Sequence, residues 1–129
     1  MPDDSPFISI GEAADMFNMP SVLFVDARDP FDYAQGHIPG AVSVPFEGTG
    51  EAKTEFMART PKDRVMVVYC GGAECDMSLF LARTLKLSGF TGVRIFFGGW
   101  SDWSLKKMPV ETGSPAGLVD SLGTGEENR

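Results

Sequence analysis

Cysteine and histidine are scarce in this chain, which has 129 residues, two cysteines and one histidine. Two cysteines cannot form the disulfide framework of a small secreted domain. With a single distant histidine they are also too few for a zinc site, so we expect no metal and no other cofactor. No run approaches the ~20 apolar residues of a membrane helix, and the first residues do not have the pattern of a signal peptide. These absences predict a cytoplasmic protein.

Basic residues are also few, since 11 Lys and Arg stand against 18 Asp and Glu, which gives a net charge of −7. Nucleic acids and anionic membrane surfaces need clustered Lys and Arg, so we expect neither as a partner. A small anionic substrate would need a local positive site, because the overall field repels it. The length is that of one domain that can bury its own core, and we expect a monomer or a weak dimer.

Short apolar runs alternate with amphipathic segments along the chain. Strands are expected over residues 7–10, 22–25, 41–44, 65–69 and 93–97, and helices over 11–18, 51–59, 76–88 and 100–107, with one helical turn at 31–35. This alternation predicts an α/β fold with a mainly parallel central sheet and helices on both faces. Residues 1–6 are expected to be an N-terminal extension, residues 7–111 the domain, and the polar residues 112–129 a flexible tail.

Two chemically active side chains follow directly after continuous apolar strands. Asp26 ends the run at 22–25, and Cys70 ends the run at 65–69. In parallel α/β sheets, ligands bind beyond the carboxyl ends of the strands. Asp26 and Cys70 are therefore both expected at the functional edge of the sheet.

The loop that begins at Cys70 has features of a site for a reactive thiol. A cysteine is nucleophilic only as the thiolate, and its free pKa is about 8.5. Gly71 and Gly72 allow positive φ angles and a close approach of the backbone to the sulfur, and Asp76 is expected as the N-cap of the next helix. Loop N–H groups and the helix end would then stabilise the anion. The same local pattern also fits an unreactive cysteine buried at the end of a strand.

Four segments in this order resemble the sequence pattern of rhodanese domains. They are residues 25–29 (VDARD) with 36–41 (GHIPGA), residues 69–72 (YCGG), Gly89-Phe90 with Val93, and residues 98–103 (GGWSDW). The resemblance covers about residues 7–111 and implies a rhodanese-like three-layer fold with a five-stranded sheet. It also implies sulfurtransferase activity, in which Cys70 takes sulfane sulfur from a donor, holds it as a persulfide and passes it to a nucleophilic acceptor. The substrate-binding loop that it implies consists of Gly71, Gly72, Ala73, Glu74, Cys75 and Asp76.

The loop departs from the family pattern in charge and length. The commonest rhodanese loop carries an Arg or Lys, whereas this one has no basic residue and contains Glu74 and Asp76. It is also about two residues longer than the usual spacing. Two acidic side chains disfavour the thiosulfate dianion as the physiological donor. We therefore expect a small-molecule or protein persulfide as the donor and a thiol as the acceptor.

Three further residues in the resembling segments are expected to support the structure. Asp26 and Arg28 fit a partly buried ion pair, and His37 fits a bracing role in its loop. A role of His37 as general base for Cys70 stays open, but persulfide transfer needs no strong base once the thiolate exists. Trp100 and Trp103 are expected to be packing residues.

Cys75 lies five residues after Cys70 in the same loop, and its role is open. It could resolve the persulfide by forming a disulfide, or it could be a buried residue at the helix start. Other functions to consider are a thiol-disulfide redox protein that uses both cysteines and a non-catalytic rhodanese-like interaction module. A phosphatase or arsenate reductase of related fold needs an arginine six residues after the cysteine, where this chain has Asp76.

Overall fold

The computed structural model describes residues 6–47 and 50–115 and contains a central five-stranded sheet. The strands are β1 (Phe7–Ile8), β2 (Leu23–Asp26), β3 (Val42–Ser43), β4 (Met66–Tyr69) and β5 (Val93–Phe96). They lie in the order β1-β5-β4-β2-β3, and every neighbouring pair is parallel. The predicted α/β class, with its mainly parallel five-stranded sheet, is therefore confirmed.

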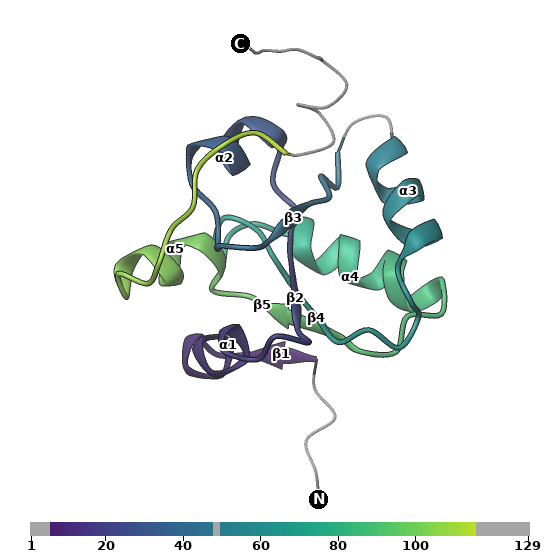
Figure 1. Cartoon of the computed structure of the whole chain (residues 1–129), viewed down its shortest axis with the longest axis horizontal. Coiled ribbons are helices and arrows are strands. Elements are labelled where there is room, and N and C mark those ends of the chain that lie inside the picture. Colours follow the sequence, from purple (N-terminus) through teal and green to yellow (C-terminus); the bar gives the residue numbers. More distant parts are fainter. Residues whose placement is uncertain (1–5, 48–49, 116–129) are drawn as a thin grey trace, which may run out of the picture.

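The helices cover both faces of this sheet. They are α1 (Ile10–Phe17), α2 (Pro30–Gln35), α3 (Glu51–Arg59), α4 (Met77–Leu87) and α5 (Gly99–Leu105). Figure 1 shows α3 and α4 on one side of the strands and α1, α2 and α5 on the other. This arrangement is the predicted three-layer fold.

The first strand is shorter than predicted because a helix cap interrupts it. Residues 7–10 were expected to be extended, but Ser9 is the N-cap of α1. The Glu12 N–H donates to Ser9 Oγ at 3.1 Å, and the Glu12 carboxylate accepts the Ser9 N–H at 2.9 Å. This reciprocal capping box makes Ile10 the first residue of the helix rather than the last of the strand.

Alternate side chains of β4 enter two separate cores. Val67 and Tyr69 pack with the fully buried Trp103 on the side of α1 and α5. Met66 and Val68 pack with Leu81 and other residues of α4 on the opposite side. Successive side chains of a strand point to opposite faces, so the residue after Tyr69 points toward α4. That residue is Cys70.

Some of the predictions concern residues that the structure does not describe. Residues 116–129 of the expected flexible tail and residues 1–5 of the expected N-terminal extension lie outside the described residues. Among the residues that are described, no helix is long and apolar enough to cross a membrane.

Candidate active site at Cys70

Cys70 is buried at the carboxyl end of β4, where its sulfur meets the start of α4. Only 1 % of the residue is exposed. The backbone N–H of Ser78, the second residue of α4, donates to Cys70 Sγ at 3.4 Å, and the Ser78 hydroxyl lies 3.5 Å from the same sulfur. The Cys70 thiol itself donates to the carbonyl oxygen of Cys75 at 3.3 Å. The Cys70 sulfur therefore lies between the loop and the first turn of the helix.

The surroundings of Cys70 act on its pKa in both directions. Burial raises the pKa of the Cys70 thiol, and donation to the Cys75 carbonyl raises it further, whereas the two contacts with Ser78 lower it. The net effect is a pKa above the ordinary value. Desolvation of the Cys70 sulfur thus acts against the stabilisation of the thiolate that the Ser78 N–H at the start of α4 provides.

The loop after Cys70 has several free backbone donors. It turns back on itself through a hydrogen bond of 2.9 Å from the Cys75 N–H to the Gly72 carbonyl. Within the described residues, the N–H groups of residues 71–74 have no hydrogen-bond acceptor. Asp76 occupies the N-cap position of α4 as predicted, but its side chain makes no capping hydrogen bond. These donors belong to the loop that begins next to Cys70.

The two loop glycines do not adopt the left-handed conformation that glycine allows. Neither Gly71 nor Gly72 has a positive φ, so that part of the expectation is wrong. A side chain on Gly72 would instead come within 3.0 Å of the Ser101 Cβ, whereas Gly71 faces open space. At the Gly72 position, glycine is needed for the close packing of the loop against α5.

The first turn of α5 donates two hydrogen bonds to the start of the loop. The Trp100 N–H donates to the Cys70 carbonyl and the Ser101 N–H to the Gly71 carbonyl, both at 2.8 Å. Gly99 has a φ of 58°, and a Cβ there would collide with the Cys70 carbonyl oxygen. Sequence reasoning did not assign Gly99, Ser101 or Ser78 to the site. The Gly98-Gly99 pair and a serine near the helix start were the available signals.

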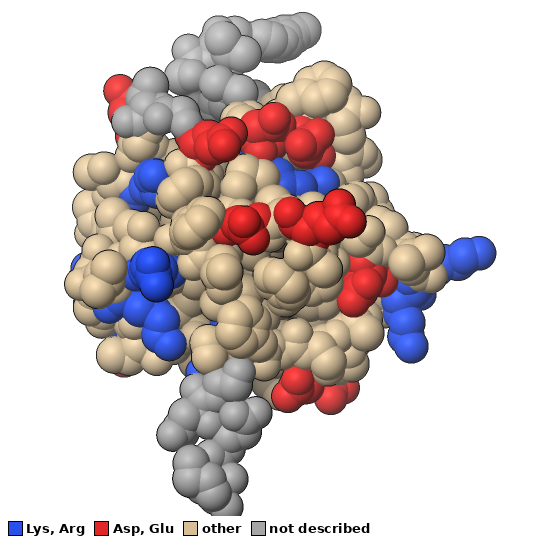
Figure 2. Space-filling model, turned by 180° about the vertical axis from the view of Figure 1, so that it is seen from behind, with Lys and Arg blue, Asp and Glu red and all other residues tan. Residues whose placement is uncertain are grey.

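A polar hollow of about 610 Å³ opens beside the loop. It is lined by Gly71, Gly72, Ala73, Glu74, Cys75, Ser101 and Asp102. The structure thus brings together the predicted loop residues up to Cys75, and Cys75 is the thiol on the wall of the hollow. Glu74 and Asp102 are the charged residues of the lining, and both are acidic. Figure 2 shows that Asp and Glu gather over the middle and top of one face of the molecule, with Lys and Arg mainly toward its sides.

Asp26 and Arg28 form a buried ion pair near this edge of the sheet. The Arg28 guanidinium contacts both carboxylate oxygens of Asp26, with a shortest distance of 2.8 Å. It also donates to the Gly36 carbonyl at 2.6 Å and lies 4.9 Å from the centre of the Trp100 ring. Burial works against the charge of Arg28, but the bonds to Asp26 raise its pKa on balance. This pair links the end of β2 to the loop after α2, through Gly36, and to α5, through Trp100.

His37 lies in a different cluster from Cys70. Its ring stacks on Tyr33 at a centroid distance of 3.6 Å, and Nδ1 lies 2.6 Å from the Tyr33 carbonyl oxygen. Nε2 lies 3.2 Å from the Glu111 carboxylate, and the backbones of His37 and Glu111 pair as an antiparallel bridge. With both ring nitrogens so engaged, His37 ties residue 111 to the loop before β3.

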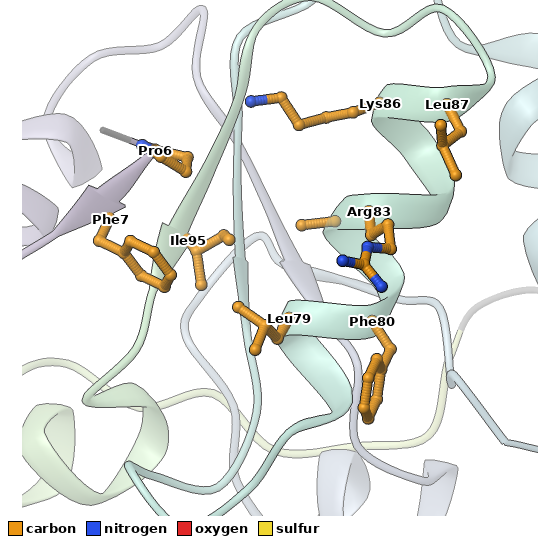
Figure 3. Close-up of a pocket in the computed structure, with 9 residues that line it drawn as sticks. Pro6, Phe7, Leu79, Phe80, Arg83, Lys86, Leu87 and Ile95 are labelled. Atoms are coloured by element: carbon orange, nitrogen blue, oxygen red, sulfur yellow. The ribbon is translucent and has the colours of Figure 1, made fainter. Parts of the chain in front are cut away.

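An apolar groove of about 450 Å³ lies between α4 and the strands β1 and β5 (Figure 3). Phe7, Leu79, Phe80 and Ile95 form much of its wall, and Arg83 and Lys86 supply the charged side chains. The part of the lining that the structure describes contains no thiol, carboxylate or imidazole. The groove therefore lacks the nucleophile that the hollow beside Cys75 has.

Comparison with known families identifies the same region of the chain. The model of the rhodanese-like domain family matches residues 9–106. This span includes both core clusters and the whole of the loop from Cys70 to α4.

Individual relatives have this region as part of a longer chain. An HTH-type transcriptional regulator of Mycobacterium tuberculosis is 34% identical over 99 residues, which are 77% of this chain and 42% of that protein. A tRNA uridine(34) hydroxylase of Escherichia coli is 28% identical over 116 residues, 88% of this chain and 32% of that one. The chain thus spans less than half of either relative. A solved structure described as a rhodanese with anions from E. coli superposes with a TM-score of 0.55 at 28% identity, over 71% of this chain and 99% of that one.

Proposed function

This chain belongs to the rhodanese-like domain family, and from that premise we propose that it is a sulfurtransferase that carries sulfane sulfur as a persulfide on Cys70. The observation that carries the proposal is the position of the Cys70 sulfur. It lies at the carboxyl end of β4 and accepts a hydrogen bond from the Ser78 N–H in the first turn of α4. A helix start next to a strand end is a favourable place for sulfur that becomes negative during the reaction. Two free thiols suit a reducing compartment such as the cytoplasm.

The reaction has two displacement steps at sulfur. In the first, the Cys70 thiolate attacks the outer sulfur of a donor persulfide, and the rest of the donor leaves as a thiolate. In the second, an acceptor thiolate attacks the outer sulfur of the Cys70 persulfide, and Cys70 leaves as a thiolate. The sulfane sulfur moves without any net oxidation of the protein.

The contacts around Cys70 favour the persulfide once a sulfur atom has been added. The thiol gives up its hydrogen bond to the Cys75 carbonyl when it ionises, while the Ser78 N–H stays directed at the sulfur. We propose that the added sulfur is held by the N–H groups of residues 71–74, which have no acceptor within the described residues. Persulfides ionise more readily than thiols, so these donors favour the loaded form.

The charge of the hollow favours an uncharged or protein-borne persulfide donor over thiosulfate. Glu74 and Asp102 repel a dianion, and among the described residues of the lining there is no Lys or Arg to offset them. We propose a thiol as the acceptor, because it can enter the same polar hollow and supply the second nucleophile.

The test uses the Cys75→Ser variant, in which Cys70 is the only thiol of the chain. The reduced protein is incubated separately with glutathione persulfide and with thiosulfate, and its intact mass is measured. We expect a gain of one sulfur atom from glutathione persulfide, much slower gain from thiosulfate, and no gain in a Cys70→Ser variant. Addition of a thiol acceptor should then remove the sulfur.

Two outcomes would contradict the proposal in different ways. No gain from either donor would reject sulfur transfer and favour an interaction module. Faster loading by thiosulfate than by glutathione persulfide would leave the persulfide on Cys70 in place and reject the proposed donor class.

A further inference from the structure

We propose that Cys75 is a resolving thiol, which attacks the Cys70 persulfide, releases its outer sulfur as sulfide and leaves a Cys70–Cys75 disulfide. This inference rests on the proposed persulfide on Cys70. It adds a second activity, the reduction of sulfane sulfur to sulfide, to the transfer of sulfur between thiols.

The sulfur of Cys70 is in direct contact with the backbone of Cys75. The Cys70 sulfur lies 3.3 Å from the carbonyl oxygen of Cys75, so it already contacts the backbone of that residue. A cysteine sulfur is only a few bonds from its own carbonyl oxygen, and rotation about Cα–Cβ swings it through that neighbourhood. A disulfide needs Cα atoms roughly 4.4–6.8 Å apart, and we infer that the loop can bring these two contacting residues into that range.

The two cysteines differ in their exposure to solvent. Cys70 is fully buried, whereas Cys75 is half-buried and forms part of the wall of the hollow. Cys75 also packs against the same core cluster that contains Cys70. Its thiol can therefore face the buried sulfur on one side and a solvent-borne reductant on the other.

Cys75 lies in the loop before α4 rather than in a helix or strand. The helix α4 begins at Met77, and the loop before it is closed by a single turn between Gly72 and Cys75. Bringing the two sulfurs together therefore breaks no hydrogen bond of the helix or of the sheet. The turn needs only to adjust its own backbone.

The resolving step is an attack of Cys75 on the Cys70 persulfide. The Cys75 thiol loses its proton to the departing sulfur, and its sulfur attacks Cys70 Sγ. The bond between Cys70 Sγ and the outer sulfur breaks, and its electron pair leaves with the outer sulfur as HS⁻. The sulfane sulfur is reduced and the two cysteines are oxidised to a disulfide. A small or protein dithiol then reduces that disulfide and returns both thiols.

The experiment compares wild type, Cys75→Ser and Cys70→Ser after loading without any acceptor. Each reduced protein receives one equivalent of glutathione persulfide without oxygen, the small molecules are collected for a sulfide assay, and the protein is measured by intact mass and peptide mapping. We expect wild type to lose two hydrogens, contain a mapped Cys70–Cys75 disulfide and release about one sulfide per chain. Cys75→Ser should keep the added sulfur and release at least tenfold less sulfide.

The outcomes separate this inference from the proposed function. If wild type keeps its persulfide and releases no more sulfide than Cys75→Ser, the resolving role is wrong while sulfur transfer stands. If neither protein is loaded, both proposals fail. A disulfide that forms without sulfide would indicate simple oxidation and would also reject the resolving role. The disulfide map and sulfide yield of wild type do not depend on the folding of either variant.

Discussion

The backbone N–H of Trp100 donates a hydrogen bond of 2.8 Å to the carbonyl oxygen of Cys70. This bond joins the start of α5 to the end of β4, two points about thirty residues apart in sequence. They meet because β4 and β5 are parallel neighbours, so the segments that follow them leave the sheet at the same edge. The conformation of the Cys70 loop therefore depends on α5 as well as on its own residues.

Replacement of Gly99 by alanine should displace this loop. Gly99 has a φ of 58°, and a Cβ there would meet the Cys70 carbonyl oxygen. The left-handed conformation alone costs an alanine roughly 1–2 kcal/mol, and overpacking adds roughly 1–3 kcal/mol. We expect a loss of stability of about 2–5 kcal/mol in urea unfolding and much slower loading of Cys70.

Gly40→Ala is the matched control for that variant. Gly40 has a φ of 82° but faces open space, so its alanine meets the conformational cost without the collision. It should lose about 1–2 kcal/mol and load sulfur normally. Equal losses of unfolding free energy in the two variants would mean that the close contact between Gly99 and the Cys70 carbonyl does not affect stability.

The strands were predictable because their environment is simple. Residues 65–69 form a continuous apolar run, and the structure has a strand at Met66–Tyr69 whose four residues are all buried. Helices cover both faces of this strand, so apolar residues occupy every position. The strand therefore stands out in the sequence as an unbroken apolar run. The ends of the short elements were less predictable, because local hydrogen bonds such as the Ser9–Glu12 cap decide them.

The site was predictable in position but not in electrostatics. A cysteine directly after a buried strand must lie at the carboxyl edge of the sheet, and Cys70 does. The pKa of the Cys70 thiol is raised first by burial and then by donation to the Cys75 carbonyl, while the contacts with Ser78 lower it. Which contacts form depends on how a loop of unusual length folds, and neither spacing nor composition reveals that.

Replacement of Ser78 by alanine should make Cys70 less reactive without unfolding the protein. The Ser78 hydroxyl lies 3.5 Å from the Cys70 sulfur and lowers its pKa, whereas the backbone N–H survives the substitution. A hydrogen bond of this kind contributes about 0.5–1.5 kcal/mol, so loading at neutral pH should slow about threefold to tenfold. Ser104→Ala, on the exposed side of α5, is the control and should load as wild type does. Loading of Ser78→Ala at the wild-type rate would show that the hydroxyl is not used.

The rate of loading should rise with pH beyond the range of an ordinary thiol. Burial raises the pKa of Cys70, so less thiolate is present at neutral pH than for a free cysteine, and each further unit of pH increases its share until the raised pKa is passed. The measurement is the rate of persulfide formation in Cys75→Ser as a function of pH. A plateau that begins below the free-thiol value of about 8.5 would contradict the raised pKa.

Arg28 should be needed for stability rather than for sulfur chemistry. It is 6 % exposed and pairs with Asp26, which is 0 % exposed, so Arg28→Ala leaves a carboxylate buried without its partner. Breaking a buried pair in this way costs about 3–5 kcal/mol. Arg28→Lys keeps the charge but loses the two-pronged contact with the carboxylate, and should lose less. Urea unfolding measures each loss.

A double variant distinguishes loss of the ion pair from loss of packing. Adding Asp26→Asn to Arg28→Ala removes the uncompensated charge, so the double variant should be more stable than Arg28→Ala alone. Arg59→Ala, at the exposed end of α3, is the control and should change stability by less than about 0.5 kcal/mol. A double variant no more stable than Arg28→Ala would mean that the stacking of Arg28 on Trp100, rather than the charge of Asp26, makes the arginine necessary. In that case Arg28→Lys should be nearly as unstable as Arg28→Ala, because an ammonium group lacks the planar surface that stacks on an indole.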